Sequence, residues 1–190
     1  MNQRPVWRLS LDNLIFKVSK AYPKISCKKT IKYFEDNIRL AKPGTGGDSK
    51  LNNLEININL NENDFSNLGN TLVKCLTKFK KKYPEIDKHL QRWAINENVS
   101  LMKYEPNQYY HYVHCENDGP KRYPKRVFAW MIFLNNIKKG GGTKFIYQKT
   151  TIKAVEGDFY MWPAYWSHFH KGVNAPKETK YILTGWCSYL

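Results

Sequence analysis

The sequence has no long apolar run. No stretch of its 190 residues approaches the roughly 20 consecutive apolar residues that cross a bilayer. The first residues, 1–7, also lack the apolar segment of a signal peptide. We therefore expect a soluble, cytoplasmic protein with no membrane partner. A chain of this length predicts a single domain, 1–190, with a sizeable core.

The sequence also lacks a cysteine framework. Its four cysteines are far apart and form no Cys-x-x-Cys pair. They are Cys27, Cys75, Cys115 and Cys187. Neither a zinc site nor a disulfide scaffold is indicated, so we expect reduced thiols.

Acidic residues are scarce. The chain has 16 Asp and Glu against 31 Lys and Arg, which gives a net charge of +15 at pH 7 and favours anions near the surface. Nucleic acid is a common partner of such proteins, yet most of the lysines are scattered, apart from clusters at 80–82 and 121–126. No nucleic-acid-binding motif accompanies them. A solvated basic surface is the simpler interpretation.

What the sequence does contain is a histidine and a carboxylate close together. His114 and Glu116 are two positions apart in an aromatic and β-branched run that is typical of a strand. Side chains at i and i+2 of a strand share a face and lie roughly 6.5 Å apart, so both can reach one metal ion. Cys115 between them points the other way. His111, three positions before His114, also lies on the opposite face.

A second source of histidine lies downstream at His168 and His170. Either one would complete a set of two histidines and one carboxylate, and strand geometry alone does not separate positions i and i+2. Such a set leaves open coordination positions and suits non-haem Fe(II) and O₂ chemistry. The residues therefore predict a metal oxygenase. His89 lies in a polar stretch and is expected at the surface.

Further motifs occur in order along the same half of the chain. They are Tyr104-x-Pro106, His114-x-Glu116, Gly140-Gly141-Gly142-Thr143-x-Phe145, Gly157-Asp158 leading to Trp162-Pro163, His170-x-Gly172, and Lys180-Tyr181 before Trp186. Together they resemble the Fe(II)- and 2-oxoglutarate-dependent dioxygenases, and within that superfamily the prolyl 4-hydroxylase-like branch. The resemblance spans about residues 100–188 and leaves the N-terminal half uncovered.

The resemblance implies a mainly β fold with N-terminal helices (α+β). The catalytic core would be a double-stranded β-helix, a cupin-like jelly roll, at 99–190, and 1–98 would supply supporting strands and helices. The residue pattern predicts eight core strands, at 99–104, 109–115, 127–134, 143–147, 151–155, 159–162, 169–173 and 181–189. Upstream it predicts an edge strand within 1–25, a strand at 51–60, and helices at 28–40, 68–83 and 86–94.

The resemblance also separates the two downstream histidines. In these dioxygenases a basic residue that binds the cosubstrate follows the distal histidine by about nine or ten positions. Lys180 is ten positions after His170 and twelve after His168. The implied metal ligands are therefore His114, Glu116 and His170, with His168 as a supporting pocket residue.

The resemblance assigns a cosubstrate site as well. Lys180 would pair with the distal carboxylate of 2-oxoglutarate, and Tyr104 and Thr184 would donate hydroxyl hydrogen bonds to it. Glu116 stands where the family usually carries aspartate. A retained carboxylate favours hydroxylation over halogenation.

The implied reaction is hydroxylation of a peptide or amino-acid substrate in the manner of a prolyl hydroxylase, with release of succinate and CO₂. Fe(II), 2-oxoglutarate and O₂ would take part, with ascorbate as a stimulant. Two alternatives stay open: a nucleic-acid or small-molecule oxygenase of the same superfamily, and a jelly-roll binding protein without catalysis. The basic segment 119–126, which would cover the substrate, favours a substrate of acidic character.

Overall fold

The computed structural model describes residues 12–44, 53–60, 65–119 and 123–190. Its framework is a large antiparallel sheet in the order β1-β9-β6-β11-β5-β3-β2, with β4 paired to the end of β11. A smaller antiparallel sheet has the order β10-β7-β8. The strands are β1 (Phe16–Val18), β2 (Lys42–Pro43), β3 (Leu54–Ile58), β4 (Trp93–Ala94), β5 (Val99–Tyr104), β6 (Arg126–Phe133), β7 (Thr143–Phe145), β8 (Thr150–Ile152), β9 (Phe159–Pro163), β10 (His170–Gly172) and β11 (Lys180–Tyr189).

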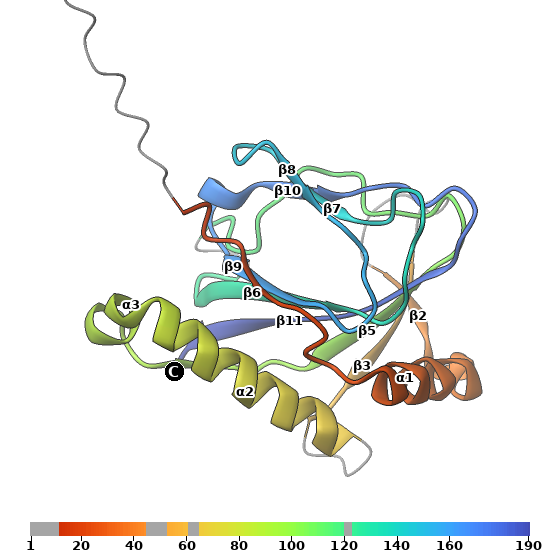
Figure 1. Cartoon of the computed structure of the whole chain (residues 1–190), viewed down its shortest axis with the longest axis horizontal. Helices are drawn as coiled ribbons and strands as arrows, with labels where there is room; N and C mark the ends of the chain where they lie inside the picture. Colours follow the sequence, from red (N-terminus) through yellow and green to blue (C-terminus); the bar gives the residue numbers. More distant parts are fainter. Residues whose placement is uncertain (1–11, 45–52, 61–64, 120–122) are drawn as a thin grey trace, which may run out of the picture.

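The small sheet lies over one face of the large sheet, and the helices lie on the other (Figure 1). Side chains between the two sheets form an inner core that includes Phe133, Phe145 and Trp162. This is the predicted jelly roll, which is confirmed.

Strand β6 shows why the pattern of a central strand differs from simple alternation. Phe128, Trp130 and Ile132 belong to the core beneath the helices, whereas Ala129 and Phe133 belong to the core between the sheets. Because both faces of β6 are covered, almost every residue in it is buried.

The helices are α1 (Lys24–Asp36), α2 (Ser66–Lys82) and α3 (Pro84–His89). Leu68, Leu72, Cys75 and Phe79 recur at helical spacing on α2 and are its main buried side chains. They pack in one core with residues of β3, β5, β6 and β11. The helices thus cover the outer face of the large sheet.

Truncation of Phe79 should test this packing. Its ring contacts the rings of Phe16, Trp93 and Phe128 edge to face. Phe79→Ala is expected to lower the free energy of unfolding by about 3–5 kcal/mol in urea denaturation, because it opens a cavity in the core. Val73→Ala, on the exposed side of the same helix, should change it by about 0.5 kcal/mol at most. Equal losses would contradict the described packing.

Two predicted helices have different bounds. The first begins at Lys24, directly after Pro23, and its predicted last turn is a separate 3₁₀ helix, Ile38–Leu40. The helix predicted at 86–94 ends at His89, because the chain becomes extended and Trp93 then pairs with Tyr189 of β11. Tertiary pairing overrides local helix propensity there.

The strand predicted at 109–115 is wrong as a regular strand. Only His114 forms a bridge, and its partner is His170. Backbone hydrogen bonds join this part of the chain to two different strands. The Tyr110 carbonyl accepts one from the Gly172 amide of β10, and the Glu116 amide donates one to the carbonyl of Ala164, directly after β9. The segment therefore crosses between two strand ends and does not follow one strand.

The edge strand predicted within 1–25 appears as β1, at one end of the large sheet. The rest of that prediction at 1–11, and the predicted strand start at 51–52, lie outside the described residues. All four cysteines are free thiols in the structure. Among the helices of the described ranges, none combines the length and apolarity that crossing a membrane requires.

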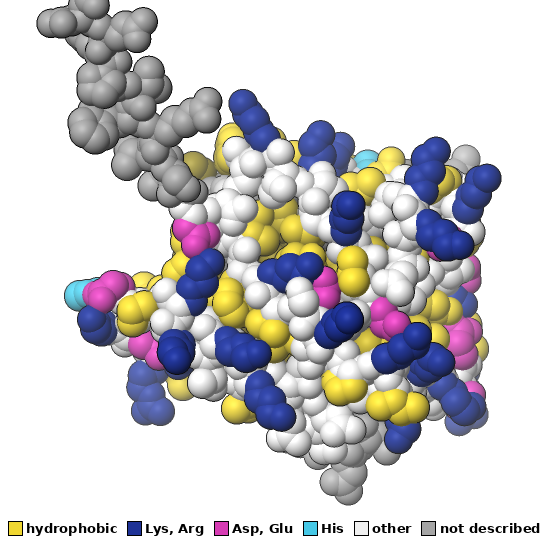
Figure 2. All heavy atoms as spheres, in the orientation of Figure 1, with side chains coloured by type: hydrophobic (Ala, Val, Ile, Leu, Met, Phe, Trp, Pro, Cys, Tyr) yellow, Lys and Arg dark blue, Asp and Glu magenta, His cyan; other side chains and the backbone are white. Residues whose placement is uncertain are grey.

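The excess of basic residues is spread over the surface. Figure 2 shows Lys and Arg side chains scattered across the face that carries α2, with apolar and acidic side chains between them. Several are paired with carboxylates, including Lys80 with Asp87 and Lys82 with Asp12. On this face, basic side chains therefore alternate with other types, and the solvated basic surface stays a prediction.

Candidate active site

A cavity of about 490 Å³ lies against the inner face of the large sheet. Alternate residues of β11, from Lys180 to Trp186, line it, and alternate residues of β5, from Ser100 to Tyr104, continue the wall. Because side chains alternate along a strand, these residues share one face of the sheet. The prediction that Lys180 and Thr184 lie on the same face is thus confirmed.

His114 and His170 reach the cavity as partners in a backbone bridge. Each amide donates to the other residue's carbonyl, at 3.0 and 2.9 Å. This pairing places the two imidazole rings side by side, with their centroids 4.3 Å apart. Two residues far apart in the sequence are thereby fixed at one point of the wall.

Backbone carbonyls set the orientation of both rings. Nδ1 of His114 lies 3.0 Å from the carbonyl oxygen of Tyr112, and Nδ1 of His170 lies 2.9 Å from that of His168. A carbonyl only accepts hydrogen bonds, so Nδ1 carries the proton in each ring. In the neutral rings, Nε2 then keeps its lone pair, which is the state that binds a metal.

Glu116 completes the group. Its Oε1 lies 3.4 Å from Nε2 of His114 and 3.4 Å from Nε2 of His170. Burial by itself would raise the pKa of this carboxyl. When Nε2 of the two histidines carries a proton, as it can without a metal, their hydrogen bonds and positive charge hold the pKa well below its usual range. Glu116 is therefore an anion that faces two imidazole nitrogens.

The donor atoms of His114, Glu116 and His170 all lie within 4.8 Å of one another. Two imidazole nitrogens and one carboxylate oxygen fit Fe(II) in a facial arrangement with open positions. His168 is outside this group because its Nε2 bonds to the Asn13 carbonyl and its Nδ1 to Ser167. His111 is also outside it, and His89 is exposed and pairs with Glu85.

Lys180 is buried in the same cavity wall. Its side chain is only 4 % exposed, and among the described residues it forms no ion pair. Its ammonium lies 4.3 Å from the ring centroid of Tyr104, its direct partner across β5 and β11. Burial lowers the pKa of Lys180 to about 8. Burial of a charged ammonium without an ionic partner raises the free energy of the folded protein. An anion that binds beside Lys180 would therefore be stabilised.

Tyr104 and Thr184 differ in the freedom of their hydroxyl groups. Tyr104 donates only to the sulfur of Met102 at 3.5 Å, a weak acceptor. Thr184 donates to the carbonyl of Trp130 at 2.8 Å, which uses its single hydroxyl hydrogen. Tyr104 therefore keeps a hydroxyl that a ligand could recruit, whereas Thr184 would first have to release the Trp130 carbonyl.

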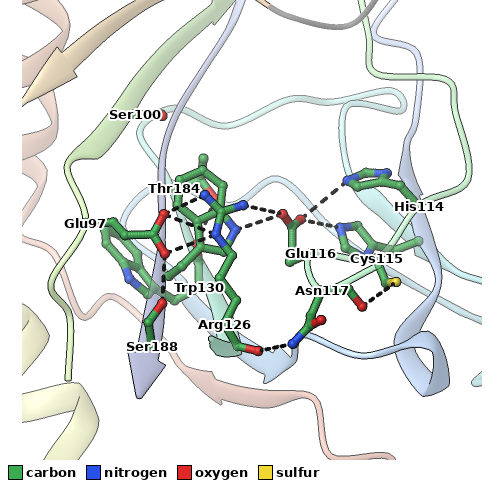
Figure 3. A network of polar contacts seen from close by, with 12 residues as sticks. Glu97, Ser100, His114, Cys115, Glu116, Asn117, Arg126, Trp130, Thr184 and Ser188 are labelled. Atoms are coloured by element: carbon green, nitrogen blue, oxygen red, sulfur yellow. Dashed lines mark hydrogen bonds and ion pairs between the residues drawn. The ribbon is translucent and has the colours of Figure 1, made fainter. Parts of the chain in front are cut away.

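One part of the site, around Arg126, has no counterpart among the residues predicted from the sequence. Arg126 contacts Glu116, and Glu97 binds Arg126 from the other side (Figure 3). Arg126 is the last residue of the basic segment 119–126, and Glu97 precedes β5 by two positions. No short-range pattern indicates a contact across 29 residues, so no sequence signal was available for it.

The fold and this group of side chains define the class of protein: a jelly roll with a site of two histidines and one carboxylate. Residues 99–188 match the model of the 2OG-Fe(II) oxygenase superfamily. Over these residues the chain is similar to that superfamily of Fe(II)- and 2-oxoglutarate-dependent oxygenases. No curated protein matches the chain.

Solved structures of prolyl hydroxylases resemble this one. The viral collagen prolyl hydroxylase of Paramecium Bursaria Chlorella virus-1, in its 2OG complex, is 20% identical, with a TM-score of 0.69 and coverage of 93% of this chain and 97% of that one. A Pseudomonas putida prolyl-4-hydroxylase is 11% identical, with a TM-score of 0.70 and coverage of 93% of each chain.

A Trichoplax adhaerens prolyl hydroxylase was solved with a peptide fragment of the hypoxia inducible factor oxygen degradation domain. It is 13% identical, with a TM-score of 0.70 and coverage of 93% of this chain and 84% of that one. At these identities the likeness concerns the fold.

Proposed function

We propose that the protein hydroxylates prolyl residues of a peptide substrate and converts 2-oxoglutarate to succinate and CO₂. The observation that carries the proposal is one cavity that brings together three side chains that could hold a metal ion and a buried lysine with no ion pair among the described residues. The choice of a peptidyl proline is supported by the fold shared with a collagen prolyl hydroxylase and with a prolyl hydroxylase bound to a peptide.

In this proposal His114, Glu116 and His170 hold Fe(II), as the sequence predicts. When bound, Fe(II) and 2-oxoglutarate would activate O₂, which is the oxidant: one of its oxygen atoms goes to succinate and the other to the hydroxyl group on proline. Lys180 pairs with the distal carboxylate of 2-oxoglutarate, and Tyr104 adds a hydroxyl hydrogen bond. The apolar side chains between the sheets keep water from this end of the cavity.

The acidic substrate predicted from segment 119–126 stays a prediction. Residues 120–122 lie outside the described residues. The guanidinium of Arg126 is paired with Glu97 and stacked between two rings, so it is not free to attract a substrate. Of the described cations in this segment, Lys125 remains exposed.

Peptide turnover tests the proposal. The protein, with Fe(II), ascorbate and 2-oxoglutarate in air, would be given proline-containing peptides with acidic, neutral or basic flanking residues. At least one peptide is expected to gain one oxygen atom on proline by mass spectrometry, with one succinate formed for each. The same peptides with alanine for proline are the control. If the alanine peptides stimulate succinate formation and the proline peptides do not, prolyl hydroxylation is contradicted.

The pH dependence of 2-oxoglutarate binding tests the role of Lys180. The free protein loses the Lys180 charge as the pH rises through about 8, whereas a bound carboxylate favours the ammonium. Affinity should therefore be steady below pH 8 and fall by up to about tenfold per pH unit above it. Anaerobic titrations between about pH 7 and pH 9 would measure this. A fall of the same size in Lys180→Met would contradict the assignment.

A further inference from the structure

The two oxygens of Glu116 have different surroundings. Oε1 faces the two histidines, at 3.4 Å from each Nε2. Oε2 accepts a hydrogen bond of 2.8 Å from the indole nitrogen of Trp186 and lies 3.7 Å from Nη1 of Arg126. One oxygen is thus directed toward the histidines, and the other is bound to the opposite wall.

Arg126 is itself fixed from several directions. Its guanidinium stacks on the rings of Tyr123 and Trp186, each at 3.6 Å. Its Nε and Nη2 donate to Glu97, with a shortest distance of 2.6 Å. The hydroxyl of Ser188 in turn donates to Glu97 at 2.8 Å. Figure 3 shows this series of contacts from Ser188 through Glu97 and Arg126 to Glu116.

This arrangement has a physical consequence for Glu116. A glutamate has one more rotatable bond than an aspartate, so its carboxylate loses more side-chain entropy when it is held in one place. Fixed partners for Oε2 restrict that freedom before any metal binds. They also leave a single oxygen to serve as ligand, which preserves the open positions that this type of site needs.

Glu97 has a separate effect through Arg126. Arginine and carboxylate tend to form short two-pronged pairs, and such a pair with Glu116 would occupy both of its oxygens. Glu97 takes that role instead, so that Arg126 stays 3.7 Å from Oε2 while it pairs at 2.6 Å with Glu97. Without Glu97, Arg126 would compete with the metal for Glu116.

We propose that Glu97, acting through Arg126, and Trp186 are positioning residues that present a single oxygen of Glu116 to the metal. The inference rests on the proposed function, because it concerns the metal site of that reaction. Contacts of this outer kind typically alter metal affinity by about 10- to 100-fold.

Calorimetric titration of the metal-free protein with Mn(II), a redox-stable divalent cation, tests the proposal without turnover. Glu97→Gln and Arg126→Lys are each expected to weaken Mn(II) binding about tenfold or more. Glu97→Gln does so because it releases the Arg126 guanidinium, and Arg126→Lys because lysine lacks the planar guanidinium group that donates two parallel hydrogen bonds.

Trp186→Phe keeps a ring against Arg126 and removes only the indole N–H that binds Oε2 of Glu116. It should also weaken Mn(II) binding. The double variant Glu97→Gln/Arg126→Lys should lose little more than either single variant, since the two residues act as one unit.

Glu105→Gln is the matched control. Glu105 also pairs with a partly buried cation, Lys103, and also accepts a hydroxyl hydrogen bond, from Thr179, but it does not line the cavity. Its variant should bind Mn(II) as the parent does. Thermal unfolding of each metal-free variant would separate lost affinity from lost structure.

The Mn(II) titrations distinguish failure of the positioning role from failure of the proposed function. If the parent binds Mn(II) and both Glu97→Gln and Trp186→Phe bind it equally well, the positioning role is overturned and the proposed function stands. If the parent binds no Mn(II), the proposed function itself fails. A loss in Glu105→Gln as large as that in Glu97→Gln would also overturn the inference, because it would point to a general effect of removing a carboxylate.

Discussion

Alanine at His170 is expected to remove Fe(II) binding and to reduce succinate formation to the level seen without protein. His170 supplies one of two imidazole nitrogens, and its Nε2 faces Glu116 at 3.4 Å, so no other described side chain can take its place. His114→Ala should have the same effect. Iron content of the purified variants and succinate formation measure both losses.

The other histidines provide the controls. His89→Ala and His111→Ala should retain most activity, because neither belongs to the group that could hold a metal. His168→Ala should still bind iron, because His168 supports His170 through its backbone carbonyl and not through its ring. Iron retained in His170→Ala and lost in His168→Ala would show that the distal ligand is assigned to the wrong residue.

The second large effect is expected at Lys180. Lys180→Met should raise the dissociation constant of 2-oxoglutarate by about 30-fold or more, because loss of one partner of a buried charge pair costs at least about 2 kcal/mol. Mn(II) binding should be unchanged. The melting temperature without ligand should rise, since a buried ammonium without an ionic partner is replaced by an apolar side chain of similar length.

Lys177→Met serves as the control for Lys180→Met. Lys177 is exposed and precedes β11, so its loss should alter neither 2-oxoglutarate binding nor stability. Equal 2-oxoglutarate affinity in the parent and in Lys180→Met would remove Lys180 from the cosubstrate site.

Much of the candidate site could be predicted from the sequence because its signals are local. His114 and Glu116 are two residues apart, and the alternation along β11 places Lys180 and Thr184 on one face whatever their neighbours are. The helices on the outer face follow from apolar spacing such as that of Leu68, Leu72 and Phe79. The alternation along β11 and the apolar spacing of α2 depend on periods of the backbone that hold in any fold.

The parts that could not be predicted depend on contacts between distant residues. His114 and Glu116 converge although 109–115 is not a strand, because a single bridge to His170 and a bond to Ala164 hold them. The Glu97 and Arg126 pair and the bond from Thr184 to the Trp130 carbonyl join residues 29 and 54 positions apart. Periodicity carries no information about such pairs.

Visible absorption reports directly on Fe(II) and 2-oxoglutarate bound together in this cavity. Fe(II) and 2-oxoglutarate would be added to the protein without oxygen, and the visible spectrum recorded. We expect a weak charge-transfer band that needs both additions, saturates at one Fe(II) per chain, and is lost in His170→Ala. A parent protein that gives no such band, although it is folded and Fe(II) and 2-oxoglutarate are in excess, would contradict the assignment of this cavity as an Fe(II) and 2-oxoglutarate site.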